Sequence, residues 1–143
     1  TNPDFTLFGM GFLGSDAARA CASLYVHSYS GTGPFAEGPA LGSLGVVEGY
    51  PLAVRTLSSI DYDGGELSGT GDGRLFAFTG VSPSKLVEYD PDTGAAIETR
   101  RLVGLPRTNA SAFAFFAGDL YLFTEALPTE SPKTKPLPAT SPR

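Results

Sequence analysis

Three similar five-residue segments constrain the fold of this chain more than any other feature. They read LYVHS at residues 24–28, LFAFT at 75–79 and LYLFT at 120–124. Short runs that are rich in aromatic residues are typical of β-strands. Because neighbouring positions in these runs are apolar, apolar side chains point to both faces of each strand, and both faces have to be covered. The segments therefore predict strands in sheets that are sandwiched between neighbouring sheets.

The spacing of these segments indicates a structural repeat. Their first residues are 51 and 45 positions apart, which is close to the length of one four-stranded blade of a β-propeller. Turns rich in Gly and Asp precede the second and third segments, at 71–73 and 117–119, and each turn follows another strand-like run, as in a hairpin. After the second segment, two more strand-like runs flank a turn at 90–94. Residues 66–101 are therefore predicted to form a complete four-stranded antiparallel meander.

We expect an all-β fold of two to three propeller-blade-like, four-stranded antiparallel sheets that form an incomplete ring. The 18 Gly and 12 Pro residues of the chain favour short strands joined by turns. The repeat domain is assigned to residues 1–125, with units at about 5–57, 66–101 and 110–125. Within the first unit, strands are predicted at 5–8, 24–28, 40–44 and 52–57. The last unit stops after two strands, because five prolines in residues 126–143 predict a disordered, Pro-rich tail.

Composition excludes several classes of partner and ligand. The net charge is −5 and the ten Lys and Arg residues are scattered, so we expect no nucleic-acid partner, which would need a clustered basic surface. No run of about 18 apolar residues is present, so we expect no membrane span. Cys21 is the only cysteine and His27 the only histidine of the chain, which argues against an internal disulfide and a zinc site. The start lacks a signal peptide, and because it begins at Thr1 instead of Met we expect a processed protein or a fragment.

The run GMGFLG at residues 9–14 matches the glycine pattern GxGxxG of dinucleotide-binding loops. In such loops the glycines let backbone amides approach a pyrophosphate at the N-terminus of a helix. A helix that starts here would end by about Ser23, which is too short for the crossover between parallel strands. We therefore expect a Gly-rich strand and turn. A nucleotide-dependent oxidoreductase that uses residues 9–14 is kept as an alternative.

Other motifs that could carry chemistry are weaker. Asp-rich runs at 61–66 and 90–94 could supply oxygen ligands for calcium, but Asp also favours turns, so we expect turns, no metal and no cofactor. The run GTGDGR at 69–74 lacks the end of a phosphate-binding loop and predicts a hairpin turn. His27 takes the position of Phe in the other two segments and predicts a partly packed strand residue with one hydrogen-bonded ring nitrogen. Because no GxSxG motif is present, no catalytic residue is predicted.

Three stretches resemble blades of known repeat proteins. They are ELSGTGDGRLFAF at 66–78, YDPDTG at 89–94 and AFAFFAGDLYLFT at 112–124. On these stretches the chain resembles bacterial β-propeller proteins of the kelch, YVTN and quinoprotein-like kinds, and repeat segments of exported proteins of myxobacterial type. The resemblance implies an extracytoplasmic bacterial protein (periplasmic, cell-surface or secreted) of a mostly binding type. The chain departs from these families in having no WD dipeptide and no Trp.

These features favour a non-enzymatic binding or scaffolding module whose ligand, a glycan or a peptide, contacts loops at one end of the sheets. The candidate loops are 29–37, 58–65, 80–84 and 105–111. The predicted binding residues combine aromatic rings with hydrogen-bonding groups: Tyr29, Phe35, Tyr62, Arg107 and Asn109. The main alternative is a ligand-free structural repeat segment of a larger surface protein. Since propellers close with four to eight blades, the chain is expected to be a fragment or to self-associate through an open strand edge after Thr124.

Overall fold

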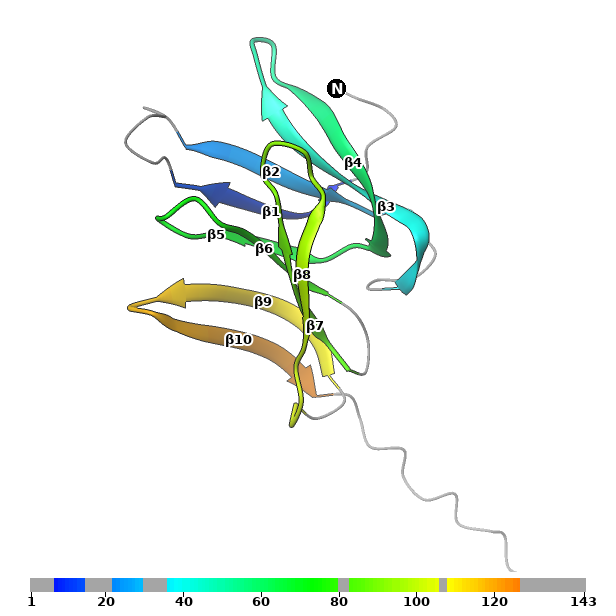
Figure 1. Ribbon diagram of the computed structural model, residues 1–143, viewed down its shortest axis with the longest axis vertical. Coiled ribbons are helices and arrows are strands. Elements are labelled where there is room, and N and C mark those ends of the chain that lie inside the picture. The colour runs from blue at the N-terminus through cyan, green and yellow to red at the C-terminus, as the bar shows by residue number, and fades with distance from the viewer. Residues whose placement is uncertain (1–6, 15–21, 30–35, 80–82, 106–107, 127–143) are drawn as a thin grey trace, which may run out of the picture.

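The structure is a computed structural model that describes residues 7–14, 22–29, 36–79, 83–105 and 108–126. Within these residues the chain forms ten β-strands and no helix (Figure 1), so the prediction of an all-β fold is confirmed. The described part of the chain accordingly holds no helical segment that could cross a membrane. The predicted Pro-rich tail lies outside the described residues, except for Ala126.

The strands form three antiparallel sheets of four, four and two strands, none of which closes on itself. The first sheet contains, in order, β1 (Leu7–Leu13), β2 (Ser23–Ser28), β3 (Ala36–Glu48) and β4 (Ala53–Asp63). The second sheet contains, in order, β5 (Glu66–Gly69), β6 (Leu75–Thr79), β7 (Lys85–Tyr89) and β8 (Ala96–Arg101). The third sheet pairs β9 (Thr108–Phe116) with β10 (Asp119–Ala126). The four-stranded meander predicted for residues 66–101 is confirmed by the second sheet.

The first sheet has longer strands than the sequence predicts. β1 continues to Leu13, and β3 and β4 span 13 and 11 residues. The predicted loop at 58–65 is wrong for residues 58–63, which continue β4. Between residues 59 and 62 the buried Ile60 and Tyr62 alternate with the exposed Ser59 and Asp61, which is the period of a strand with one covered face. The polar neighbours resemble turn residues and hide this alternation.

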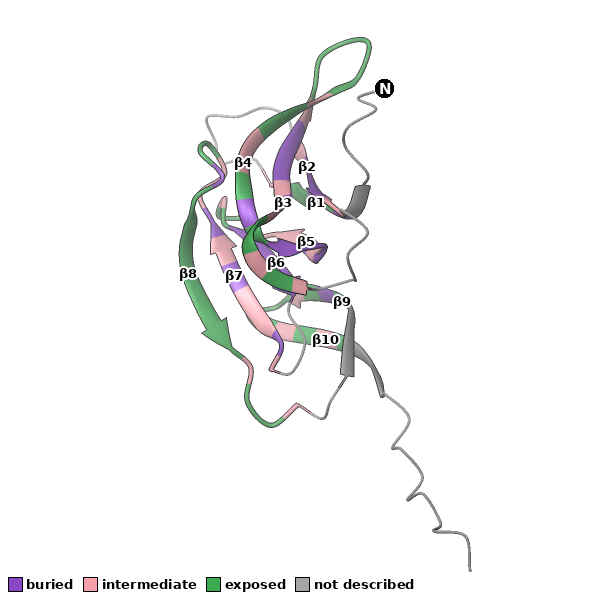
Figure 2. Ribbon diagram, turned by 90° about the vertical axis from the view of Figure 1, so that its right-hand side faces the viewer, coloured by how far each residue is buried: buried purple, intermediate pink, exposed green. Residues whose placement is uncertain are grey.

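The three sheets pack face to face in the order of the chain (Figure 1). β1 packs on β5, and β5 packs on β9. Each of these is the first strand of its sheet and lies at a sheet edge, so the three first strands lie next to one another. β4 and β8 form the opposite edges of the first two sheets. Figure 2 shows that β8 is exposed along its whole length.

Glycines let the backbones of β1 and β5 lie in direct contact. A Cβ atom on Gly11 would lie 2.6 Å from the carbonyl oxygen of Leu67, and one on Gly69 would lie 2.7 Å from the Cα atom of Leu13. The glycine motif at 9–14 therefore serves sheet packing from within a strand. The expected Gly-rich strand is thus confirmed for residues 9–13, whereas in a dinucleotide-binding loop the glycines lie in the turn between a strand and a helix.

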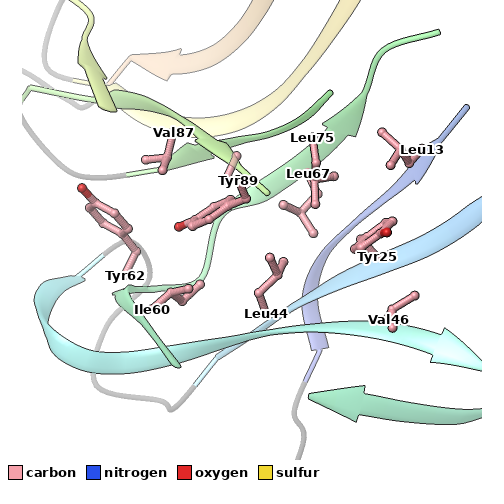
Figure 3. Packing of buried hydrophobic residues seen from close by; sticks show 11 residues of the cluster. Leu13, Tyr25, Leu44, Val46, Ile60, Tyr62, Leu67, Leu75, Val87 and Tyr89 are labelled. Carbon is pink, nitrogen blue, oxygen red and sulfur yellow. The ribbon is translucent and has the colours of Figure 1, made fainter. Parts of the chain in front are cut away.

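Stacking of the sheets creates two hydrophobic cores. The core between the first and second sheets (Figure 3) contains aliphatic residues and three tyrosines: Leu13, Tyr25, Leu44, Val46, Ile60, Tyr62, Leu67, Leu75, Ala77, Val87 and Tyr89. The buried residues of the core between the second and third sheets are all phenylalanines, with half-buried leucines and Phe115 packed against them. The ring centroids lie 4.9 Å apart for Phe76 and Phe115, and 6.0 Å apart for Phe78 and Phe113.

β6 is the strand that both cores share. All of its residues, 75–79, are buried. Leu75 and Ala77 point into the first core, and Phe76 and Phe78 point into the second. The prediction that this segment is covered on both faces is therefore confirmed.

The same prediction is wrong for residues 120–124. In β10, Leu120 and Leu122 pack against the second core, whereas Tyr121 and Phe123 are exposed. The third sheet is the last in the stack, and no further sheet among the described residues covers its other side. β10 therefore has one covered and one open face.

Candidate functional site

Three of the five predicted binding residues, Tyr29, Tyr62 and Asn109, lie within the described residues. Tyr29 follows β2 and is partly exposed, whereas Tyr62 lies within β4 and is buried. Asn109 lies in β9, so the predicted loop at 105–111 is wrong from residue 108 onward; the side chain of Asn109 is outside the described part of the chain. Phe35 and Arg107 lie outside the described residues. Of these five positions, Tyr62 borders a cleft.

This cleft has a volume of about 400 Å³ and lies between β4 and the hairpin of β7 and β8. Its walls carry hydroxyl groups from both sheets, on Ser58, Ser59, Tyr62, Tyr89, Thr93 and Thr99. Asp61 adds a carboxylate, and none of the described residues that line the cleft is basic. The cleft therefore offers a ligand many hydrogen-bonding groups and little charge.

The turn between β7 and β8 is held by its own backbone hydrogen bonds. The Asp90 carboxylate accepts hydrogen bonds from the backbone N–H groups of Asp92 and Thr93, at 2.9 and 2.8 Å. These hydrogen bonds lower the pKa of the Asp90 carboxyl group, and the bond from Thr93 has the largest effect. Gly94 closes the turn with φ of 73° and donates its N–H to the Asp90 carbonyl oxygen at 2.8 Å. The run at 90–94, which could have supplied oxygen ligands for calcium, is thus a turn. Its first carboxylate, that of Asp90, accepts hydrogen bonds from backbone N–H groups.

Two further hydrogen bonds attach this turn to the first sheet. The Ser58 hydroxyl donates to the carbonyl oxygen of Gly94 at 2.7 Å. The Tyr25 hydroxyl donates to the carbonyl oxygen of Pro91 at 3.1 Å. The turn therefore joins β2 and β4, which fixes one wall of the cleft against the other.

A buried hydroxyl without a partner lies at the inner wall of the cleft. Tyr89 is almost completely buried, and its hydroxyl has no hydrogen-bond partner among the described residues. Burial raises the pKa of Tyr89, so the phenol stays neutral. Figure 3 shows the Tyr89 hydroxyl pointing toward Tyr62, whose ring lies 5.4 Å from the Lys85 ammonium group. An unpartnered buried hydroxyl costs about 1–3 kcal/mol, and the Tyr89 hydroxyl lies beneath the surface of the cleft.

His27 does not belong to the cleft. Its ring is completely buried at the end of β2, and Nδ1 lies 3.2 Å from the carbonyl oxygen of Gly65. Because a carbonyl only accepts hydrogen bonds, Nδ1 carries the proton, and Nε2 has no partner within the described part of the chain. Burial lowers the pKa of His27 to about 4, although the bond to Gly65 and the charge of Asp63 act in the opposite direction. The prediction of one bonded nitrogen is confirmed, and the ring is packed more completely than predicted.

Two further clefts lie between the second and third sheets: one of about 440 Å³ at the turns of the β5–β6 and β9–β10 hairpins, and one of about 210 Å³ beside it. The smaller of the two is lined by charged side chains. Two ion pairs dominate its polar side: Arg74 with Glu88, at 2.6 Å, and Arg100 with Glu98, at 2.8 Å. The Arg74 guanidinium also lies 4.8 Å from the centre of the Phe76 ring. The charges of this cleft are paired with one another, so it offers no excess charge to a ligand. Within the described residues, no three His, Cys, Asp or Glu side chains cluster closely enough to hold a metal ion.

Most of the hydroxyl groups that line the cleft beside Tyr89 were not predicted from the sequence. The alternation of Ser59 and Asp61 with Ile60 and Tyr62 could have revealed β4 and its polar face. Tyr89 is recognisable only as the last residue of an apolar strand. Its proximity to β4 depends on the packing of two sheets, for which the sequence carries no local signal.

Comparison of the chain with models of protein families, with curated proteins and with solved structures gives no match.

Proposed function

We propose that the chain is a non-enzymatic binding module built from propeller-type blades. The observation that carries this proposal is the cleft between β4 and the hairpin of β7 and β8, which is lined by hydroxyl groups of two sheets, with the unpartnered hydroxyl of Tyr89 buried in its wall among the described residues. A few well-placed polar groups of this kind orient a ligand. The strand order supports the blade architecture, because each sheet starts at the strand that packs on a neighbouring sheet and continues as an antiparallel meander.

A neutral glycan is the ligand class that the cleft favours. Ser, Thr and Tyr hydroxyls both donate and accept hydrogen bonds, as sugar hydroxyls do. A peptide would instead need apolar pockets for its side chains or a strand edge for backbone pairing. The hydroxyl-lined walls favour the glycan, and peptide capture is a competing outcome of the test.

The test is a screen of immobilised neutral glycans, followed by calorimetric titration of those that bind. Tyr89→Phe removes only the hydroxyl and relieves an unpartnered polar group, so the variant is expected to fold. We expect its affinity for the bound glycan to fall about tenfold, the loss of one hydrogen bond. Tyr50→Phe is the matched control, because Tyr50 is fully exposed at the turn after β3. Equal affinity of both variants, or binding of peptides in place of glycans, would contradict the glycan proposal.

A ligand-free structural segment of a larger surface protein is the second candidate. It is favoured by the aromatic residues Phe116, Tyr121 and Phe123, which are exposed on the third sheet. Under this alternative, the screen finds no ligand, and removal of those aromatic residues weakens association with neighbouring blades. Substitutions in the cleft then leave every measured association unchanged.

We also propose that the protein acts outside the cytoplasm of a bacterium, in the periplasm, at the cell surface or in the medium. The support is the resemblance of the YDPDTG turn at 89–94 to turns in exported bacterial propellers. Fractionation of the native host, with detection by an antibody, tests this. Recovery of the protein in the cytoplasmic fraction alone would contradict it.

A further inference from the structure

Asp61 carries the one charged side chain among the described residues that line the cleft beside Tyr89. Lys85 lies close to this cleft, with its ammonium group 5.4 Å from the centre of the Tyr62 ring. Because Lys85 is ion-paired with Glu37, its positive charge is compensated. The charge that a ligand meets in the cleft is therefore the negative charge of Asp61.

The backbone of β3 is irregular directly opposite Asp61. The pairing of β3 with β4 shifts its register there, so residues 38–41 of β3 lie opposite Asp61 alone. A Cβ atom on Gly42 would lie 2.0 Å from the carbonyl oxygen of Tyr62, so the close return of β3 to β4 requires glycine. Bulges of this kind often lie next to active sites, where they redirect a side chain. The irregularity thus lies opposite the carboxylate of the cleft.

The bulge also holds the Asp61 side chain in place. The backbone N–H group of Ala40 donates a hydrogen bond to Oδ1 of Asp61 at 3.1 Å. Ala40 has φ of 53°, a left-handed conformation that is uncommon for residues other than glycine. Such conformations persist where the surrounding structure enforces them, and they cluster at binding and active sites. The bond to Ala40 orients the carboxylate through Oδ1, which leaves Oδ2 to accept hydrogen bonds from a ligand.

The charge of Asp61 reaches the inner wall of the cleft. Burial is the main cause of the raised pKa of Tyr89, and the charges of Tyr62 and Asp61 act in the same direction. The carboxylate of Asp61 and the hydroxyl of Tyr89 therefore influence the same space. A ligand that enters this space meets both the field of the carboxylate and the hydroxyl groups of the walls.

We propose that Asp61 sets the charge selectivity of the cleft: it accepts hydrogen bonds from a neutral glycan and rejects glycans that carry acidic groups. This inference rests on the proposed function, because it concerns the ligand of the same cleft. A sugar hydroxyl that donates to a carboxylate forms a charge-assisted hydrogen bond, which is stronger than a bond between neutral groups. The carboxylate of an acidic sugar would find no basic partner among the described lining residues and would be repelled by Asp61.

Matched pairs of oligosaccharides test this selectivity on the full chain by calorimetric titration. Each pair consists of a neutral hexose oligosaccharide and its uronate counterpart, in which a carboxylate replaces the hydroxymethyl group of each sugar. The wild-type chain is expected to bind the neutral member at least about tenfold more tightly, because like charges in an interface disfavour the wrong ligand. The ratio of the two affinities is expected to shrink in high salt, which screens exposed charges.

Asp61→Asn removes the charge and keeps an oxygen that can accept the hydrogen bond from Ala40, so the variant is expected to fold. Its affinity for the neutral member should fall about fivefold, the loss of charge assistance in one hydrogen bond. Its affinities for the two members should become nearly equal. Asp119→Asn is the matched control, because it makes the same change of charge at an exposed residue of the third sheet. The control should keep the wild-type ratio, which separates the effect of Asp61 from that of the net charge of −5.

Three results would overturn the inference. They are a wild-type chain that binds both members equally well, an Asp61→Asn variant that keeps the wild-type ratio, and an Asp119→Asn variant that loses it. Failure of the proposed function looks different. If both members bind equally well and Tyr89→Phe weakens their binding, the cleft binds glycans and the role of Asp61 is refuted. If neither member of any pair binds to the wild-type chain, the inference and the glycan proposal both fail.

Discussion

β6 and residues 120–124 of β10 have similar sequences, LFAFT and LYLFT, but different surroundings. Both faces of β6 lie in hydrophobic cores, whereas only one face of β10 does. The difference comes from position, because β6 lies in the middle sheet of the stack and β10 in the last. The sequence of an apolar strand thus shows how many of its faces can be buried. The number of neighbouring sheets determines how many faces are buried.

The largest expected effect tests this comparison directly. Phe78→Ala in β6 empties a completely buried position and should lower the free energy of unfolding by about 3–5 kcal/mol. Phe123→Ala in β10 removes an exposed ring and should change it by less than about 0.5 kcal/mol in the isolated chain. Urea denaturation, at a concentration where light scattering reports single chains, measures both values. Similar losses for the two variants would contradict the difference in burial.

β2 extends the comparison, because His27 is the fourth residue of its segment, the position that Phe78 has in β6. The pKa of buried His27 is lowered to about 4, from about 6.5 in the unfolded chain. The unfolded chain therefore binds a proton first as the pH falls. The resulting loss of stability begins near pH 6.5, is complete near pH 4 and amounts to roughly 3 kcal/mol at most.

Denaturation at several pH values between 7 and 4 measures this effect. His27→Phe should remove this part of the pH dependence, while protonation of carboxylates affects both chains alike. If the wild-type and variant chains lose stability in parallel, His27 is not the group responsible. The difference between the two curves is therefore the quantity to compare.

A smaller effect is expected where the first sheet covers the second. A Cβ atom added by Gly69→Ala would overlap the backbone of β1, so the substitution should destabilise the fold by about 1–3 kcal/mol. Gly71→Ala is the matched control, because nothing lies within 4 Å of a Cβ atom there. Its effect should stay within about 0.5 kcal/mol. Equal melting temperatures for the two variants would show that β1 and β5 are not in backbone contact.

The smallest effect is expected on the charged part of the second sheet. Arg74→Met removes the ion pair with Glu88, whose side chains are 47% and 13% exposed, and the contact of the guanidinium group with Phe76. Exposed pairs contribute little, so the loss should stay below about 1 kcal/mol and should shrink further in high salt. A loss as large as that of Phe78→Ala would mean that this region is packed like a core.

The sequence predicted the second sheet well, because its strands are short and its turns are marked by Gly, Asp and Pro at 71–73 and 90–94. It predicted β4 poorly, because the polar residues between Ser58 and Asp63 resemble a loop. Burial of β10 was overestimated for another reason. Local pattern shows that both faces are apolar, but the number of neighbouring sheets is a property of the whole chain.

The candidate cleft was less predictable than the fold. Tyr62 was named from the sequence as a loop residue, and it borders the cleft from within a strand. Tyr89 was not named, because its unpartnered hydroxyl is a consequence of sheet packing. Residues that meet only through such packing are far apart in the sequence, and no local motif marks them.

The glycine-lined contact between β1 and β5 also bears on how the chain is made. Gly9 and Gly11 leave the ribosome more than fifty residues before Leu67, the residue on which Gly11 packs. Until β5 has been synthesised, this face of β1 has no partner. Because glycine has no side chain, Gly9 and Gly11 cannot bind another segment in its place. The β1–β2 pair of a nascent chain therefore leaves one face of β1 without its partner until β5 follows, and incomplete packing of this kind favours aggregation.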